Sequence, residues 1–183
     1  MAKSDKKFKE LILLICTWSE HDPKFGAIKL NKILFHSDFS AYLTYGEAIT
    51  GEEYFKLKNG PAPRRMLPMT KKMEASGEFA FKEVEYHGFK QKRPIALRPP
   101  DIDVFTSREV GLVHKTIAKY WKMSASEISL RSHGFLGWMA VREKETIPYS
   151  TALVGTRKPT EAEIAYGLEL QPMAAECLAR VRR

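Results

Sequence analysis

The sequence predicts an α+β fold that is mostly α-helical, a helical core with a small β-hairpin or sheet. Apolar residues recur at helical spacing through most of the chain. One stretch, residues 78–98, has two runs of strand-forming residues around a glycine, as a β-hairpin does. Hydrophobic residues make up 44% of the 183 residues, which is enough to build a packed core without cross-links. We therefore expect a single domain spanning residues 1–183, with a C-terminal helical extension over about 156–183.

Two helices are predicted near the N-terminus, over residues 5–20 and 26–45. The first has a single apolar face, formed by Phe8, Leu11, Ile12, Ile15 and Trp18. The second is apolar over a wide arc and is followed by Gly46, a residue type that commonly ends helices. We expect this second helix to be the central and most buried one.

The next segment, residues 49–63, indicates short extended or turn structure, because apolar residues there lie between Gly51 and Gly60-Pro61. Thr50-x-x-Glu53 would instead cap a helical turn. Pro63 then opens a helix over residues 64–76, which an internal proline is expected to delay or bend. The hairpin of residues 78–98 follows.

Three sequences of the form [ST]-x-x-E mark helix starts in the second half, because the hydroxyl and the carboxylate each satisfy a free backbone N–H. They begin at Thr106, Ser124 and Thr160. The first opens a helix that runs to about Lys122, and the second opens a short helix. The third caps a last helical region that Pro172 interrupts.

Charge and cysteine content narrow the class of partner and the compartment. The 30 Lys and Arg against 22 Asp and Glu give a net charge of +8, which favours nucleic acid or an acidic protein face. Cys16 and Cys177 are too far apart for a zinc or redox motif, and their apolar helical surroundings predict small buried side chains. Without a signal peptide or a long apolar run, we expect a cytoplasmic protein that does not enter a membrane.

The sequence offers no catalytic constellation that we can assign. It contains no phosphate-binding loop, dinucleotide fingerprint, zincin motif or C-x-x-C. His36 and Asp38 point to different faces of one helix, so we expect one to be buried and hydrogen-bonded and the other exposed. His133 has no recognisable nucleophile or acid partner, and we expect it to end a helix and bond to backbone. We assign no catalytic residue, no metal ligand and no cofactor.

A helix-turn-helix is the alternative interpretation of residues 124–144. Ser124 to Arg131 would form the first helix, 132–134 the turn and 135–144 the second helix, with 147–154 as a loop or short strand. The second helix is mostly apolar, however, whereas base readout needs outward Arg, Asn, Gln or Lys. A buried helix is therefore the favoured interpretation.

The chemistry of Lys29, Lys32 and the Gly60-Pro61 turn predicts their structural roles. Lys29 and Lys32 lie on the mostly apolar second helix, and we expect their stems to follow apolar surface while their charges reach water or an acidic partner. Gly60-Pro61 forces a sharp change of chain direction, because glycine permits positive φ and proline fixes φ.

Four short motifs occur in a fixed order. They read K-L-x-K-[LI]-L-[YF] over residues 29–35, I-T-G-[DE]-x-[YF] over 49–54, x-G-P-[VA] over 59–62, and [LI]-S-x-x-[ST]-H-x-x-x-x-W over 128–138. In this order and spacing the chain resembles the Panacea domain found in SocA-like antitoxins, over roughly residues 10–140. The polar run 36–38 and Ala62 depart from the pattern. The motif residues, whose roles the resemblance leaves unassigned, are Lys29, Leu30, Lys32, Gly51, Gly60, Pro61, Ser132, His133 and Trp138.

The resemblance implies an antitoxin of a bacterial or phage toxin–antitoxin system, which neutralises a protein toxin by direct contact and has no catalytic residues. Exposed aromatic side chains near the Gly-Pro turn and the hairpin would anchor the toxin, and our candidates are Tyr54, Phe55 and Phe89. The alternative hypothesis is a DNA-binding transcriptional regulator that uses residues 124–144.

Overall fold

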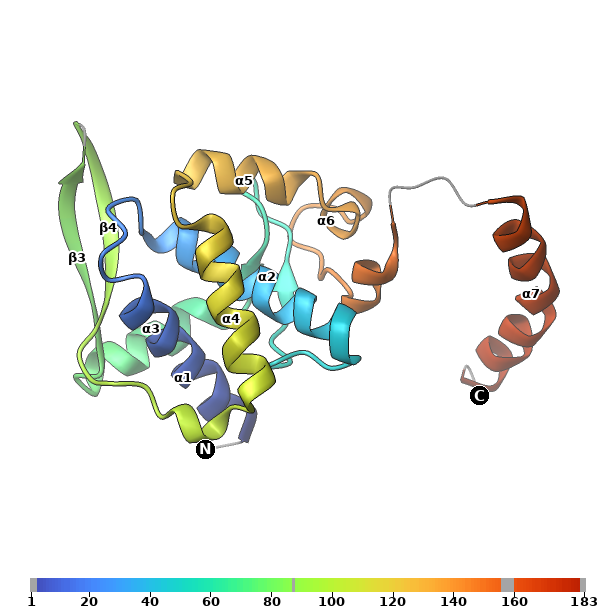
Figure 1. Cartoon of the computed structure of the whole chain (residues 1–183), viewed down its shortest axis with the longest axis horizontal. Coiled ribbons are helices and arrows are strands. Elements are labelled where there is room, and N and C mark those ends of the chain that lie inside the picture. The colour runs from blue at the N-terminus through green and yellow to red at the C-terminus, as the bar shows by residue number, and fades with distance from the viewer. Residues whose placement is uncertain (1–2, 87, 156–159, 182–183) are drawn as a thin grey trace.

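The computed structural model describes residues 3–86, 88–155 and 160–181. Within these ranges it holds seven α-helices, two 3-10 helices and two two-stranded antiparallel sheets, so the mostly helical α+β prediction is confirmed. Figure 1 shows a body of packed helices with a long hairpin at one end and the last helix standing apart at the other. No helix in the described part is long and apolar enough to cross a membrane.

Both N-terminal helices form as predicted, as α1 (Lys3–Trp18) and α2 (Ala27–Tyr45). Ten residues of α2 are buried, and this helix contacts α1, α4, α5 and the hairpin strand β4. It runs through the middle of the body in Figure 1. Gly46 ends it in the left-handed conformation, with φ at 78°, and donates its N–H to the Tyr42 carbonyl. The expectation of a central, most buried second helix is therefore met.

The segment after α2 contains one very short sheet, in which β1 (Tyr54–Phe55) pairs with β2 (Ala62–Pro63). The helical turn considered for Thr50-x-x-Glu53 does not form, because the Thr50 groups bond to α2 instead. Next comes α3 (Met66–Ala75), which starts late, as Pro68 predicts. The hairpin follows as β3 (Phe79–Tyr86) and β4 (Phe89–Ala96), paired from Phe79–Ala96 at its base.

The second half contains a short 3-10 helix, η1 (Ile102–Val104), and then α4 (Ser107–Tyr120) and α5 (Ala125–His133). The predicted capping boxes form at Thr106 and Ser124. The prediction of a helix over 135–144 is wrong in length. Only α6 (Leu136–Ala140) forms, since Val141 is extended and Lys144 has a positive φ of 68°.

A loop or short strand was expected over residues 147–154. The structure instead has a second 3-10 helix there, η2 (Tyr149–Leu153), which packs against α2 and α6. The last helix, α7 (Glu161–Val181), is capped by Thr160 as predicted. Pro172 lies inside α7 and does not interrupt it, which corrects the prediction. Pro172 itself is exposed, so water can bond the carbonyl that the proline leaves free.

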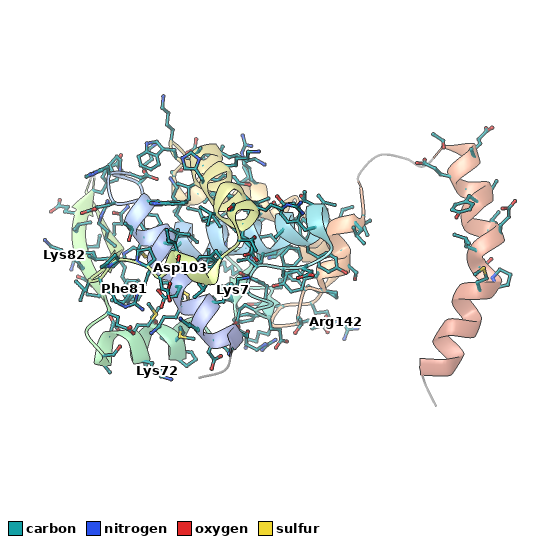
Figure 2. The ribbon with its side chains drawn as sticks, turned by 60° about the horizontal axis from the view of Figure 1, so that its bottom comes forward. Lys7, Lys72, Phe81, Lys82, Asp103 and Arg142 are labelled. Carbon is teal, nitrogen blue, oxygen red and sulfur yellow. The ribbon has the colours of Figure 1, made fainter. Side chains whose placement is uncertain are left out.

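One continuous core joins the body, and the apolar residues predicted for α1 lie in it or pack against it. The prediction of a single apolar face is wrong, because α1 is buried on all sides over residues 10–16. Cys16 is buried in that core, whereas the side chain of Cys177 lies outside the described ones. Figure 2 shows the contrast with α7, whose side chains have none of the body around them. Its described large apolar side chains are exposed, namely Ile164, Tyr166, Leu168, Leu170 and Met173.

Gly60 is required on two grounds, its backbone angle and the lack of space for a side chain. Its φ is 89°, and a Cβ there would lie 2.4 Å from the Ser132 Oγ and 2.9 Å from the Lys32 Cε. Gly77 also has a positive φ, 71°, but a Cβ there would meet nothing within 4 Å. The turn at Gly60 therefore needs glycine both for its backbone angle and for the close approach of α2 and α5.

This difference predicts the outcome of two alanine substitutions. Gly60→Ala should lower the free energy of unfolding by about 3 kcal/mol or more, because strain and overpacking add. Gly77→Ala should cost about 1 kcal/mol, since only the positive φ is penalised. Urea denaturation of the two variants measures both values. Equal losses would contradict the close packing at Gly60.

Candidate functional site

Lys29 is buried, and its ammonium group joins three segments of the chain. Its Nζ lies 2.5 Å from the Asp22 Oδ2 and 2.8 Å from each of the carbonyl oxygens of Trp121 and Met123. Burial lowers the pKa of Lys29. The expectation was that its charge reaches water or an acidic partner. The amine is closed to water, and the acid that it meets is a buried carboxylate from the loop after α1 of the same chain.

Lys32, one turn further along α2, is also buried, so the same expectation is wrong for it. Its Nζ donates to the Pro61 carbonyl oxygen at 2.8 Å, and no described carboxylate pairs with it. Burial lowers its pKa to about 7. Ser132 on α5 is fully buried beside this contact and donates to the Ser129 carbonyl. Two motifs that lie far apart in the sequence, Gly60-Pro61 and Ser132, therefore meet on α2.

Asp38 organises the turn that contains the I-T-G-E-E-Y motif. Its carboxylate accepts hydrogen bonds from the Thr50 N–H at 2.8 Å, the Thr50 hydroxyl at 2.5 Å and the Tyr54 hydroxyl at 2.7 Å. Asp38 is completely buried, and burial raises its pKa to about 6. Gly51, at φ 67°, provides the reversal between the two bonded residues. Asp38 departs from the motif pattern in sequence, yet in the structure it is the residue that holds the motif turn.

Glu52 of the same turn faces the start of α3. Its carboxylate accepts from the Arg65 backbone N–H and from the Arg65 guanidinium at 2.7 Å, and the Glu52 side chain is fully buried. Arg65 also pairs with Asp5 on α1. The turn is therefore fixed to α2 on one side and to α1 and α3 on the other.

His133 ends α5 as predicted, but the expected bond from its side chain to backbone is absent among the described residues. Its ring instead stacks on Trp138, with centroids 4.2 Å apart and planes at 16°. The Lys56 Nζ lies 4.2 Å from the Trp138 ring and donates to the Val141 carbonyl. This stack ties α6 to the segment after β1, which is a structural role.

The other histidine prediction is half right. Asp38 is the buried, hydrogen-bonded member of the pair, but His36 is not exposed. Its ring lies on Tyr120 of α4 with centroids 4.8 Å apart, and burial lowers its pKa to about 3. The described side chains contain no group of three or more His, Cys, Asp and Glu that could hold a metal ion.

The three proposed anchors differ in exposure. Tyr54 is 1% exposed, so the expectation that it lies on the surface is wrong, because its hydroxyl is drawn inward to Asp38. Phe55 is half-buried, with the Arg64 guanidinium 4.9 Å from its ring. The side chain of Phe89 lies outside the described ones. A partner contact through Phe55 stays a prediction.

Sequence reasoning missed two of the acids that hold the motifs, Asp22 and Glu52, and left open whether Asp38 or His36 is the buried one. A lone carboxylate among apolar helix residues, such as Asp38 between Phe35 and Phe39, could have indicated a buried acceptor. Asp22 carried no such signal, since it lies in a loop of ordinary composition.

These contacts define an α+β, mostly helical domain whose motif residues serve as internal bonds between segments. Residues 30–139, more than half of the chain, match the family described as antitoxin SocA-like, Panacea domain. The chain belongs to this SocA-like antitoxin family. No curated protein and no solved structure matched the chain.

Asp38 predicts a defined pH dependence of stability. Its folded pKa of about 6 exceeds the ordinary value of 3.8, so the folded state holds the proton more tightly than the unfolded state does. The Asp38 contribution to stability is therefore full below about pH 4 and is lost as pH rises through about 6. The loss should reach about 3 kcal/mol at most.

Asp38→Asn isolates this contribution, because the other titrating groups cancel in the comparison. Urea denaturation at pH 4 and pH 7 should find the wild type losing stability relative to Asp38→Asn as the pH rises. A stability difference that is constant across this range would contradict a raised pKa at Asp38.

Lys29 predicts a large mutational effect. Lys29→Met leaves the Asp22 carboxylate buried without its cation, which should cost about 3–5 kcal/mol of unfolding free energy. Lys24→Met is the matched control and should cost under about 1 kcal/mol, since among the described residues the Lys24 Nζ bonds only to the exposed carbonyl of Lys122. Thermal denaturation compares the two. A loss in Lys29→Met no greater than in Lys24→Met would show that the pair is dispensable.

Proposed function

We propose that this chain is the antitoxin of a bacterial or phage toxin–antitoxin system, and that it neutralises a cognate protein toxin by binding it directly. The observation that carries the proposal is the match of residues 30–139 to the SocA-like antitoxin family. Antitoxin membership points to a protein partner and to a role without catalysis. We propose further that the two proteins meet in the cytoplasm, the compartment predicted from the sequence.

The buried motif residues support binding over catalysis. Lys29, Lys32, Asp38 and Glu52 are all engaged with other parts of the fold and are closed to solvent. A general acid, base or nucleophile must reach a substrate, and these groups do not. Neutralisation would then proceed by occlusion, in which the antitoxin covers the active or target-binding surface of the toxin. Such an interface typically buries about 1,200–2,000 Å².

The net charge of +8 supports the DNA-binding alternative, but the helix that was to read the bases is too short. Residues 135–144 were to supply the reading helix, and α6 covers only Leu136–Ala140. Gly137 on this helix is packed so closely that a Cβ would lie 2.1 Å from the Thr151 Oγ1. A helix of this length, held against η2, does not fill a major groove as recognition helices do.

Growth assays with the protein encoded by the neighbouring open reading frame test the proposal. Each protein is placed under its own foreign promoter, so that control of a native operator cannot explain rescue. We expect the neighbour to arrest growth when expressed alone, and growth to resume when this chain is also made. The two proteins should then co-purify.

A version of this chain with an early stop codon is the control and should not restore growth. Rescue only from the native operon, with no complex between the purified proteins, would favour a DNA-binding regulator. A neighbour that does not arrest growth, or a toxicity that persists beside the full chain, would contradict the antitoxin proposal.

A further inference from the structure

An open groove lies where the end of α1 meets the C-terminal half of α4 and the chain that leads to α5. Its volume is about 680 Å³. Trp18, Ile117, Trp121 and Met123 supply apolar surface, and the exposed side chains of Lys119 and Lys122 stand at its rim. Two of the three tryptophans of the chain therefore line one surface feature. None of the family-motif residues lines it.

The charge of the groove is of one sign. No carboxylate lines it, and neither Lys119 nor Lys122 forms an ion pair with any described residue. The Lys24 Nζ lies 2.9 Å from the carbonyl oxygen of Lys122 and brings a third ammonium group to this end of the groove. The His114 ring stands edge-on to Trp18, with centroids 5.8 Å apart. An occupant that carries negative charge would balance this rim.

The groove wall is held in place from inside the protein. The buried Lys29 amine bonds the carbonyl oxygens of Trp121 and Met123, both of which line the groove. Asp22 holds that amine on its other side. The two groove residues are thus positioned before anything binds, which reduces the entropy lost on association.

We infer that this tryptophan groove receives an acidic segment of the partner protein, in which Asp or Glu side chains flank a bulky apolar side chain. The apolar side chain would pack between Trp18 and Trp121, and the carboxylates would meet Lys119 and Lys122. The inference rests on the proposed function, which supplies a protein partner. Tryptophan is among the residues that contribute most to protein interfaces, and opposite charge raises the rate of encounter.

Single-stranded nucleic acid is the competing occupant, since bases also stack on tryptophan above a cationic rim. The observations favour a peptide for two reasons. The family match indicates a protein partner. The cationic rim is also short, since it consists of the ammonium groups of Lys119, Lys122 and the nearby Lys24, whereas grooves that bind single strands follow the phosphate backbone with positive charge.

Charge reversal tests the inference with a matched control. The double variant Lys119→Glu with Lys122→Glu should weaken binding of the protein encoded by the neighbouring open reading frame by about 30-fold or more. The control, Lys71→Glu with Lys72→Glu, changes the net charge equally at exposed positions of α3. Lys72 is labelled in Figure 2, well away from α4. We expect the control to change the Kd less than about 3-fold.

A second variant separates this surface from the one around Phe55. Phe55→Ala should leave the affinity nearly unchanged if the groove holds the partner. The inference would be overturned if the Lys119→Glu, Lys122→Glu variant bound as tightly as the wild type, or if only Phe55→Ala lost much of its affinity. Either result would leave the antitoxin proposal standing. Failure of the wild type to bind or neutralise the neighbouring protein counts instead against the proposed function.

A probe that does not depend on that neighbour completes the test. We would titrate the full chain with a tryptophan-free peptide that alternates Asp and Glu with Leu and Phe, and follow intrinsic fluorescence. Binding should change the tryptophan emission of the wild type and of the Lys71→Glu, Lys72→Glu control. It should not change the emission of the Lys119→Glu, Lys122→Glu variant. A peptide with Lys in place of its acids should have no effect.

An acidic peptide that leaves the wild-type emission unchanged up to millimolar concentration contradicts the groove as an acidic-segment site. The groove would instead be assigned to nucleic acid if a single-stranded oligonucleotide changed the emission, if salt suppressed that change, and if the Lys119→Glu, Lys122→Glu variant did not show it.

Discussion

The buried ion pair of Lys29 and Asp22 is the constraint on which the arrangement of this domain depends. A lysine ammonium has three N–H donors, and in this protein an Asp22 oxygen and two backbone carbonyls lie within hydrogen-bond distance of it. These acceptors come from the loop after α1 and from the end of α4, while the amine comes from α2. Burying a charge is costly unless it is paired and bonded, so the three segments can meet favourably in few other ways.

Buried polar groups are also paired along the irregular segment that follows α2. That segment has little regular secondary structure, so its polar groups need partners from elsewhere. Asp38 accepts from Thr50 and Tyr54, Lys32 donates to the Pro61 carbonyl, and Glu52 binds Arg65. The motif that identifies the family is thus largely a set of internal bonds between α2 and its turns.

The groove beside Trp121 is held in place by one of these buried bonds. Lys29 is a motif residue without access to solvent, yet it bonds the backbone of two residues that line the groove. The apolar surface and the lysines of the rim are supplied by α1, α4 and the residues directly after α4, which carry none of the four motifs. The motif residues and the groove are therefore separate in sequence but joined by one buried amine.

The sequence by itself determined the helical class, the central place of α2, the hairpin and the capping boxes, because apolar periodicity and capping act between residues that are close in the chain. It also determined the family, through the order of four short motifs. Only the tertiary structure decided that Lys29, Lys32 and Tyr54 are buried, that Asp38 holds the motif turn, and that residues 141–144 leave the helix. Each of these depends on a partner many residues away, Trp121 for Lys29 and Lys56 for Lys144 among them, and local pattern carries no information about which distant group will be there.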